Sequence, residues 1–223
     1  MDNQVNAVYQ VNFAAFSVYI TTLPPHLLTM LNIQSERIKK SWPKVNMNSS
    51  LAGHIQNQYS LNPMSELDDF LLNLSTQYYD YLQKTGNVQQ TFTNVPSLKC
   101  GKPWINFQAK TEYNPLHNHS GLFSWVLWLK IPYNREEEAK CFPDREDVLN
   151  GSFNFVYPHF SGLSTHRVDL DESYEGRLIL FPSTLQHMVY PFYTTDEYRV
   201  SVSGNIYIDN SGWAKSREAE YDK

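Results

Sequence analysis

The feature that most restricts the fold is a change of hydrophobic period near residue 100. Beyond that point apolar residues alternate with polar ones, as at Phe153, Phe155 and Tyr157, which is typical of half-buried strands. Residues 122–131 form an almost continuous apolar run, as expected of a strand buried on both faces. Short strands separated by turn signals predict a sandwich or barrel for this half of the chain.

The first 90 residues predict two helices instead. Pro24-Pro25 would open the first, which ends at Lys39-Lys40. Ser65 is a suitable N-cap for the second, and Gly86 a suitable stop. Its apolar residues follow at steps of three or four, and we interpret them as a core-facing stripe: Leu67, Phe70, Leu71, Leu74, Tyr78 and Tyr81. The acidic run 136–138 is most simply a solvated loop.

Length and composition restrict the class of protein. A chain of 223 residues with 41% apolar content favours one folded structural domain overall. Within it we expect a helical support region over residues 1–95, a β core over 96–210 and a tail over 211–223. The net charge of −5 provides no basic excess, so we do not expect nucleic-acid binding.

The cysteines and the N-terminal sequence indicate the cellular compartment. Cys100 and Cys141 form no CxxC pair, which excludes a disulfide framework and a zinc ribbon and suits a reducing cytoplasm. No Lys or Arg precedes Arg37, so we expect no signal peptide. The apolar stretch 11–20 is too short to span a bilayer, so we expect no membrane association. We therefore expect a cytoplasmic protein, in the host cytoplasm if the chain is viral.

Three of the seven histidines are candidate metal ligands. His117 and His119 form a His-x-His pair, which we place at the start of a strand, where side chains two apart share a face. His187, on the strand after Phe181-Pro182-Ser183, is the best candidate for a third ligand. Imidazole suits iron, zinc, copper or nickel, and three ligands on one side leave open positions. The alternative is that these are ordinary histidines making hydrogen bonds.

Residues 198–208 predict a strand with two different faces. Its apolar face carries Val200 and Val202, whereas Arg199 and Ser201 lie on the polar face. A guanidinium and a hydroxyl on one face are well made to hold a carboxylate. The alternative is a solvated surface arginine.

The order of these motifs resembles a known family. His-x-His, about seventy residues, then Gly-x-Leu-x-Leu-Phe-Pro-Ser-x-x-x-His-x-Val-x-Pro and Arg-x-Ser is similar to the 2-oxoglutarate/Fe(II)-dependent oxygenases. More narrowly, it resembles oxygenases of marine bacteria and their phages. The matching segments are 104–107, 114–121, 176–191 and 198–205, about half of the chain.

The resemblance implies a mainly β fold, a double-stranded β-helix of the jelly-roll or cupin-like type. N-terminal helices would pack outside it, making the chain α+β overall. It implies Fe(II) at the mouth of the barrel, with His117 and His187 as ligands. It also implies 2-oxoglutarate held by Arg199 and Ser201, in a pocket to which we assign Asn106 and Trp104. The implied activity is hydroxylation of an unactivated C–H bond, with molecular oxygen consumed and succinate and carbon dioxide released.

One departure concerns the third ligand. The family triad is His-x-Asp with a distant His, but here position 119 is His and no Asp or Glu lies between 114 and 130. Three arrangements are open. In the first, His119 binds the metal directly; in the second, water fills the third ligand position. In the third, His119 is the first ligand and Gly121 stands at the position of the family's carboxylate. We favour the first arrangement, because His-x-His also occurs among the bacterial relatives.

Three rival functions stay open. His-x-His with a distant His also suits a catalytic zinc enzyme, although zinc chemistry does not explain Arg199-x-Ser201. The others are a jelly-roll binding module and an oxygenase that has lost activity. The substrate, peptidyl or small-molecule, is not specified, and hydroxylation at proline is a family analogy only. We expect residues 134–150 and 158–173 to form its rim. The oligomeric state is equally open.

Overall fold

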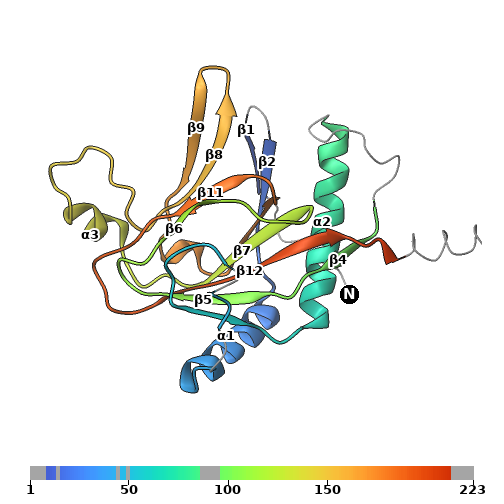
Figure 1. Cartoon of the computed structure of the whole chain (residues 1–223), viewed down its shortest axis with the longest axis horizontal. Helices are drawn as coiled ribbons and strands as arrows, with labels where there is room; N and C mark the ends of the chain where they lie inside the picture. Colours follow the sequence, from blue (N-terminus) through green and yellow to red (C-terminus); the bar gives the residue numbers. More distant parts are fainter. Residues whose placement is uncertain (1–8, 14–15, 44–45, 49–50, 86–95, 212–223) are drawn as a thin grey trace, which may run out of the picture.

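The fold is built from two antiparallel sheets flanked by helices (Figure 1). The computed structural model describes residues 9–13, 16–43, 46–48, 51–85 and 96–211. The larger sheet has the strand order β1-β2-β10-β7-β12-β5-β3, with β4 pairing β12, and the smaller has the order β6-β11-β8-β9. This arrangement is the jelly-roll that the resemblance implies.

The strands of the larger sheet come from both halves of the chain. They are β1 (Tyr9–Phe13), β2 (Phe16–Thr22), β3 (Asn57–Ser60), β4 (Leu98–Cys100), β5 (Trp104–Gln108), β7 (Phe123–Lys130), β10 (Arg177–Pro182) and β12 (Arg199–Ile208). The smaller sheet contains β6 (Asn114–His117), β8 (Phe153–His159), β9 (Gly162–Val168) and β11 (Gln186–Val189). A short 3-10 helix, η2 (Glu172–Tyr174), precedes β10.

Strand β7 is buried on both faces, as its apolar run predicts. Trp125 and Leu127 belong to the core between the larger sheet and the helices. Val126 and Trp128 belong to the core between the two sheets. Each such side chain contributes about 1.5–3 kcal/mol through burial. Gly204 of β12 lies opposite Trp125, and a Cβ there would stand 2.8 Å from the indole ring, so only glycine fits.

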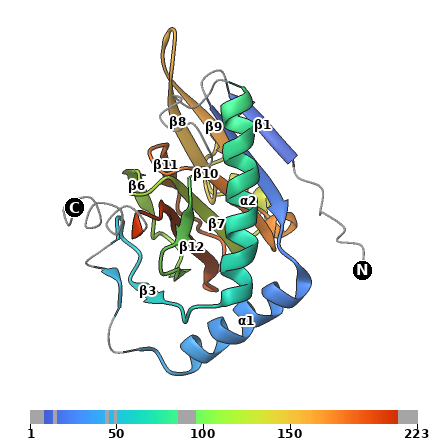
Figure 2. The ribbon, with the colours of Figure 1, turned by 90° about the vertical axis from the view of Figure 1, so that its right-hand side faces the viewer.

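Two helices cover the outer face of the larger sheet (Figure 2). Helix α1 (Pro25–Lys40) starts and ends where its proline and lysine pairs predict. Helix α2 (Ser65–Lys84) buries the predicted stripe, although Phe70 and Tyr81 are only partly buried. Met64, not Ser65, occupies the N-cap position, so the predicted cap was wrong by one residue. Gly86, the predicted stop, lies outside the described residues. None of the described helices combines the length and apolar character that crossing a membrane requires.

The acidic run 136–138 is not a solvated loop. It forms helix α3 (Arg135–Lys140), with the Asn134 side chain accepting hydrogen bonds from the main-chain N–H groups of Glu136 and Glu137. Glu138 is fully buried, and its carboxylate accepts bonds from the main-chain N–H groups of Tyr193 and Thr194 at 2.9–3.0 Å. The charge pattern predicts exposure but does not reveal these buried donors.

Candidate functional site

The three candidate histidines meet between two neighbouring strands of the smaller sheet. His117 is the last residue of β6 and pairs directly with His187 of β11. His119 follows β6 in a loop, where its main-chain N–H donates to the Ser183 carbonyl at 2.9 Å. The predicted position at the start of a strand is therefore wrong, because the pair lies at the end of β6. Their rings have centroids 4.3–5.0 Å apart, and one ligand nitrogen from each lies within 4.8 Å of the others.

Main-chain carbonyls orient two of these rings. The Nδ1 atom of His117 lies 2.7 Å from the Pro115 carbonyl oxygen, and that of His187 lies 3.0 Å from the Leu185 carbonyl oxygen. Because a carbonyl only accepts, each Nδ1 carries the proton of the neutral ring and leaves the Nε2 lone pair free. A carbonyl behind the ring is the arrangement found around metal-binding histidines.

Burial keeps the three imidazoles neutral. Loss of hydration lowers the pKa of His117 below the usual histidine value and lowers that of His119 to about 4. The same cause places the pKa of His187 well below its usual value, since the ring packs against Phe153 and Phe181. Neutral imidazoles with converging lone pairs are the form that binds a divalent metal ion.

No described residue that lines the cavity beside the histidines is acidic. Position 121 does not offer a vacant carboxylate slot, because a Cβ there would meet the Ile206 carbonyl oxygen at 2.8 Å and the Tyr207 ring at 3.4 Å. The donor set that the structure brings together is therefore three imidazoles, and it fits a metal ion such as iron or zinc.

Arg199 lines the same cavity and is only 2% exposed. Its guanidinium donates to Oε1 of Gln108, the hydroxyl of Tyr133, and the carbonyls of Gly151 and Tyr190. None of these acceptors carries a negative charge. A buried cation without an anionic partner is costly, and a carboxylate ligand entering the cavity would relieve that cost.

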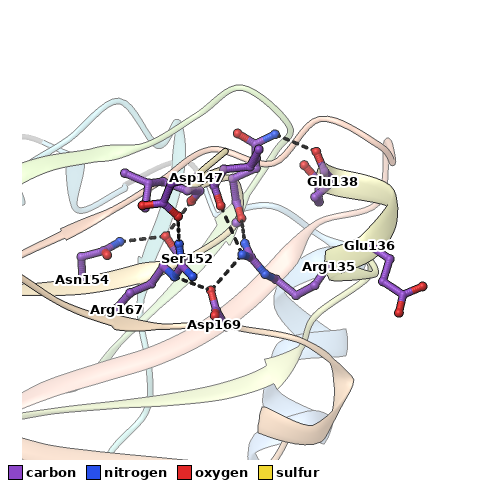
Figure 3. Close-up of polar contacts among 12 residues, drawn as sticks. Arg135, Glu136, Glu138, Asp147, Ser152, Asn154, Arg167 and Asp169 are labelled. Carbon is purple, nitrogen blue, oxygen red and sulfur yellow. Dashed lines mark hydrogen bonds and ion pairs between the residues drawn. The ribbon is translucent and has the colours of Figure 1, made fainter. Parts of the chain in front are cut away.

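Ion pairs and hydrogen bonds join the segment before Gly151 to α3 and β9 (Figure 3). Arg135 donates to the Asn150 and Val148 carbonyls and pairs with Asp169 at 2.9 Å. Figure 3 shows Arg167 reaching the same carboxylate, also at 2.9 Å, as well as Asp147. These contacts involve the chain immediately before Gly151, whose carbonyl accepts a hydrogen bond from Arg199.

The other predicted pocket residues lie on the same inner face. Ser201 accepts a hydrogen bond from Asn106 at 3.2 Å, and Gln58 donates to Asn106 at 2.8 Å. Trp104 lines the cavity, and its ring centroid lies 5.7 Å from that of His119. The polar face of β12 therefore faces this cavity and not bulk solvent.

A sequence model of the family described as "Putative 2OG-Fe(II) oxygenase" matches residues 102–205, which contain all three histidines and Arg199. Over this range, just under half of its length, the chain is similar to the 2-oxoglutarate/Fe(II) oxygenase family. The match and the three-histidine cluster together indicate a 2-oxoglutarate- and Fe(II)-dependent oxygenase, and the cluster is suited to hold the iron. A search of curated proteins gives no match.

Solved structures support the fold of the oxygenase. A prolyl-4-hydroxylase of Pseudomonas putida shares 16% identity, with a TM-score of 0.51, over 92% of this chain and 94% of the other. A prolyl hydroxylase of Trichoplax adhaerens, solved with a peptide fragment of a hypoxia inducible factor, shares 15% identity. Its TM-score is 0.50, over 95% of this chain and 88% of the other. At such identities the likeness establishes the jelly-roll alone.

Several features of the oxygenase's cavity were not found from the sequence. Gln108 and Tyr133 contact Arg199, yet only the alternation along β5 could have placed Gln108 on the inner face. The cavity lining includes Leu51, Ala52 and Ile55, from a segment without a clear pattern. Neither 134–150 nor 158–173, the predicted rim, contributes a described residue to that lining. Those ranges instead contain α3 and much of the β8–β9 hairpin.

Proposed function

We propose that the oxygenase hydroxylates an unactivated C–H bond of a peptidyl or small-molecule substrate, with His117, His119 and His187 as the iron ligands. In the same proposal, Arg199, helped by Ser201, receives the distal carboxylate of 2-oxoglutarate. The observation that carries this assignment is that the three imidazoles and the buried guanidinium line one cavity.

Bound iron and 2-oxoglutarate supply the oxygen chemistry, in which oxidative decarboxylation yields succinate and carbon dioxide and the second oxygen atom goes to the substrate. The protein contributes geometry and electrostatics. The carbonyls of Pro115 and Leu185 keep the imidazoles of His117 and His187 in one tautomer. The guanidinium fork of Arg199 orients a dicarboxylate relative to them.

The burial of the cavity assists the same chemistry. Trp128, Phe153 and Phe181 form an apolar wall that limits the access of water. Leu51, Ala52 and Ile55 add apolar surface from the N-terminal half. We also propose that this activity takes place in the cytoplasm and that residues 96–210 carry its catalytic residues.

A turnover assay tests the proposal. Fe(II)-loaded protein with 2-oxoglutarate and oxygen should release succinate, initially uncoupled from any substrate and faster when a true substrate is added. His187→Ala should lose iron binding and succinate release together, whereas the matched control His26→Ala should lose neither. His26 lies on α1 and pairs with Glu66 at the surface. A folded wild-type protein that retains zinc but releases no succinate would favour a zinc enzyme instead.

A further inference from the structure

We propose that Gln108 is a placeholder for the cosubstrate: its amide oxygen occupies the edge of Arg199 that receives the distal carboxylate, and 2-oxoglutarate binding displaces it. This inference rests on the proposed function, in which Arg199 receives that carboxylate. It adds a positioning residue that acts through Arg199 and moves during binding.

The hydrogen bonds of Arg199 show why some group must leave. A guanidinium has five N–H groups, and here all five are used. Nε and Nη2 donate to the single Oε1 atom of Gln108 at 3.2 and 2.5 Å. Nη1 donates to Tyr133 and Gly151 at 2.6 Å each, and Nη2 also donates to the Tyr190 carbonyl at 3.2 Å. A carboxylate can pair with two N–H groups only after existing bonds break.

Three of the four acceptors are held in place. The main chain of Gly151 donates to the Pro191 carbonyl, and that of Tyr190 donates to the Ser152 carbonyl, at 2.8 and 2.9 Å. The Tyr133 hydroxyl donates to the Gly151 carbonyl at 2.7 Å, and its ring stacks on Phe192 with centroids 4.9 Å apart. Moving any of these groups would disturb the inter-sheet core.

Gln108 is the acceptor that can move. It is a flexible side chain on β5, lies directly opposite Arg199 in the register and lines the cavity. Its oxygen spans the Nε and Nη2 atoms, which form one of the two edges that a carboxylate grips through two bonds. Its Nε2 atom donates to the Glu112 carbonyl at 2.6 Å, so this second contact can keep the displaced amide nearby.

Charge sets the direction of the exchange. The amide oxygen of Gln108 is a neutral acceptor, whereas a carboxylate adds the opposite charge and can accept two parallel N–H bonds from the guanidinium. In the ligand-free protein the amide satisfies two buried N–H groups that would otherwise be unpaired. The placeholder therefore keeps Arg199 in position while lowering the apparent affinity for 2-oxoglutarate.

Calorimetric titration of Zn(II)-loaded protein with 2-oxoglutarate tests this inference without turnover. Gln108→Ala removes the competing acceptor, so we expect about three- to tenfold tighter binding, the equivalent of one hydrogen bond. Its melting temperature should fall without 2-oxoglutarate and recover with it. Gln108→Glu places a permanent carboxylate against Arg199, so we expect at least about tenfold weaker binding with unchanged metal affinity.

A control and two opposing outcomes complete the test. Gln34→Ala removes a glutamine of α1 that accepts from the Asn62 main chain, and it should leave the affinity for 2-oxoglutarate unchanged. Unchanged or weaker binding by Gln108→Ala would overturn the inference, because Gln108 would then be a fixed support. Should Gln108→Ala not fold, Gln108→Glu decides alone, and wild-type affinity would overturn the inference. If wild-type protein binds no 2-oxoglutarate, the proposed function itself fails.

Discussion

Replacing Arg199 by lysine separates the shape of this side chain from its charge. The guanidinium is 2% exposed and uses its five N–H groups on four acceptors, whereas an ammonium has three donors and no planar fork. Each buried hydrogen bond that is lost costs about 1–3 kcal/mol, so we expect the free energy of unfolding to fall by about 2–4 kcal/mol.

Arg199→Lys should also weaken cosubstrate binding. A carboxylate held by two charge-assisted bonds loses one of them, which costs about 1.5–3 kcal/mol and weakens 2-oxoglutarate binding about 10- to 150-fold. Metal affinity should stay unchanged, because none of the contacts of Arg199 involves a histidine.

Calorimetry with 2-oxoglutarate, combined with urea unfolding, measures both effects of this substitution. Arg177→Lys is the matched control, since Arg177 lies over the Tyr174 ring at 4.9 Å and does not line the cavity. It should leave the affinity for 2-oxoglutarate unaltered. A folded Arg199→Lys protein that binds 2-oxoglutarate as tightly as the wild type would refute the assignment of this guanidinium.

Three further predictions concern buried groups outside the cluster of histidines. Gly151→Ala should lower the free energy of unfolding by at least about 2 kcal/mol in urea titration, because φ is +69° and a Cβ would stand 2.6 Å from the Tyr133 ring; wild-type stability would contradict this. Glu138→Gln should lower the free energy of unfolding by about 2–4 kcal/mol in the same titration, since the amide turns an N–H donor toward buried N–H groups. A decrease below about 0.5 kcal/mol would contradict this expectation. Burial raises the pKa of Cys100 to about 12, so iodoacetamide at pH 8 should alkylate the exposed Cys141 first. The alkylation rate of Cys100 should then rise about tenfold for each unit of pH. Equal alkylation rates for the two cysteines at pH 8 would contradict this.

The sequence predicts the core elements well where one physical signal dominates. The apolar run of β7 and the stripe of α2 report burial directly, and the alternation along β12 separates the core-facing valines from Arg199 and Ser201. The His-x-His spacing predicts that the two rings lie close together, and they do, although His119 lies just beyond the end of β6 and not on the strand. The distant partner, His187, is a candidate from its place on a later strand, and the family resemblance supports the same choice.

The sequence does not predict contacts that depend on tertiary packing. Nothing local indicates that Glu138, within an acidic run, is buried against the main chain of Tyr193 and Thr194. Nor does it show that Tyr133, in the loop after β7, and Gln108, on β5, both contact Arg199, since these segments meet only in the folded protein. The segment that includes Leu51 and Ile55 has no hydrophobic periodicity, so the sequence does not show that these residues line the cavity.

The central claim is that three imidazoles and one guanidinium form a single site for iron and 2-oxoglutarate. Anaerobic titration of the metal-free protein with Fe(II), followed by 2-oxoglutarate, tests it most directly. We predict a weak visible charge-transfer band that saturates at one iron and one 2-oxoglutarate per chain and is absent from His187→Ala. A folded protein that binds iron yet develops no such band with 2-oxoglutarate would contradict the account.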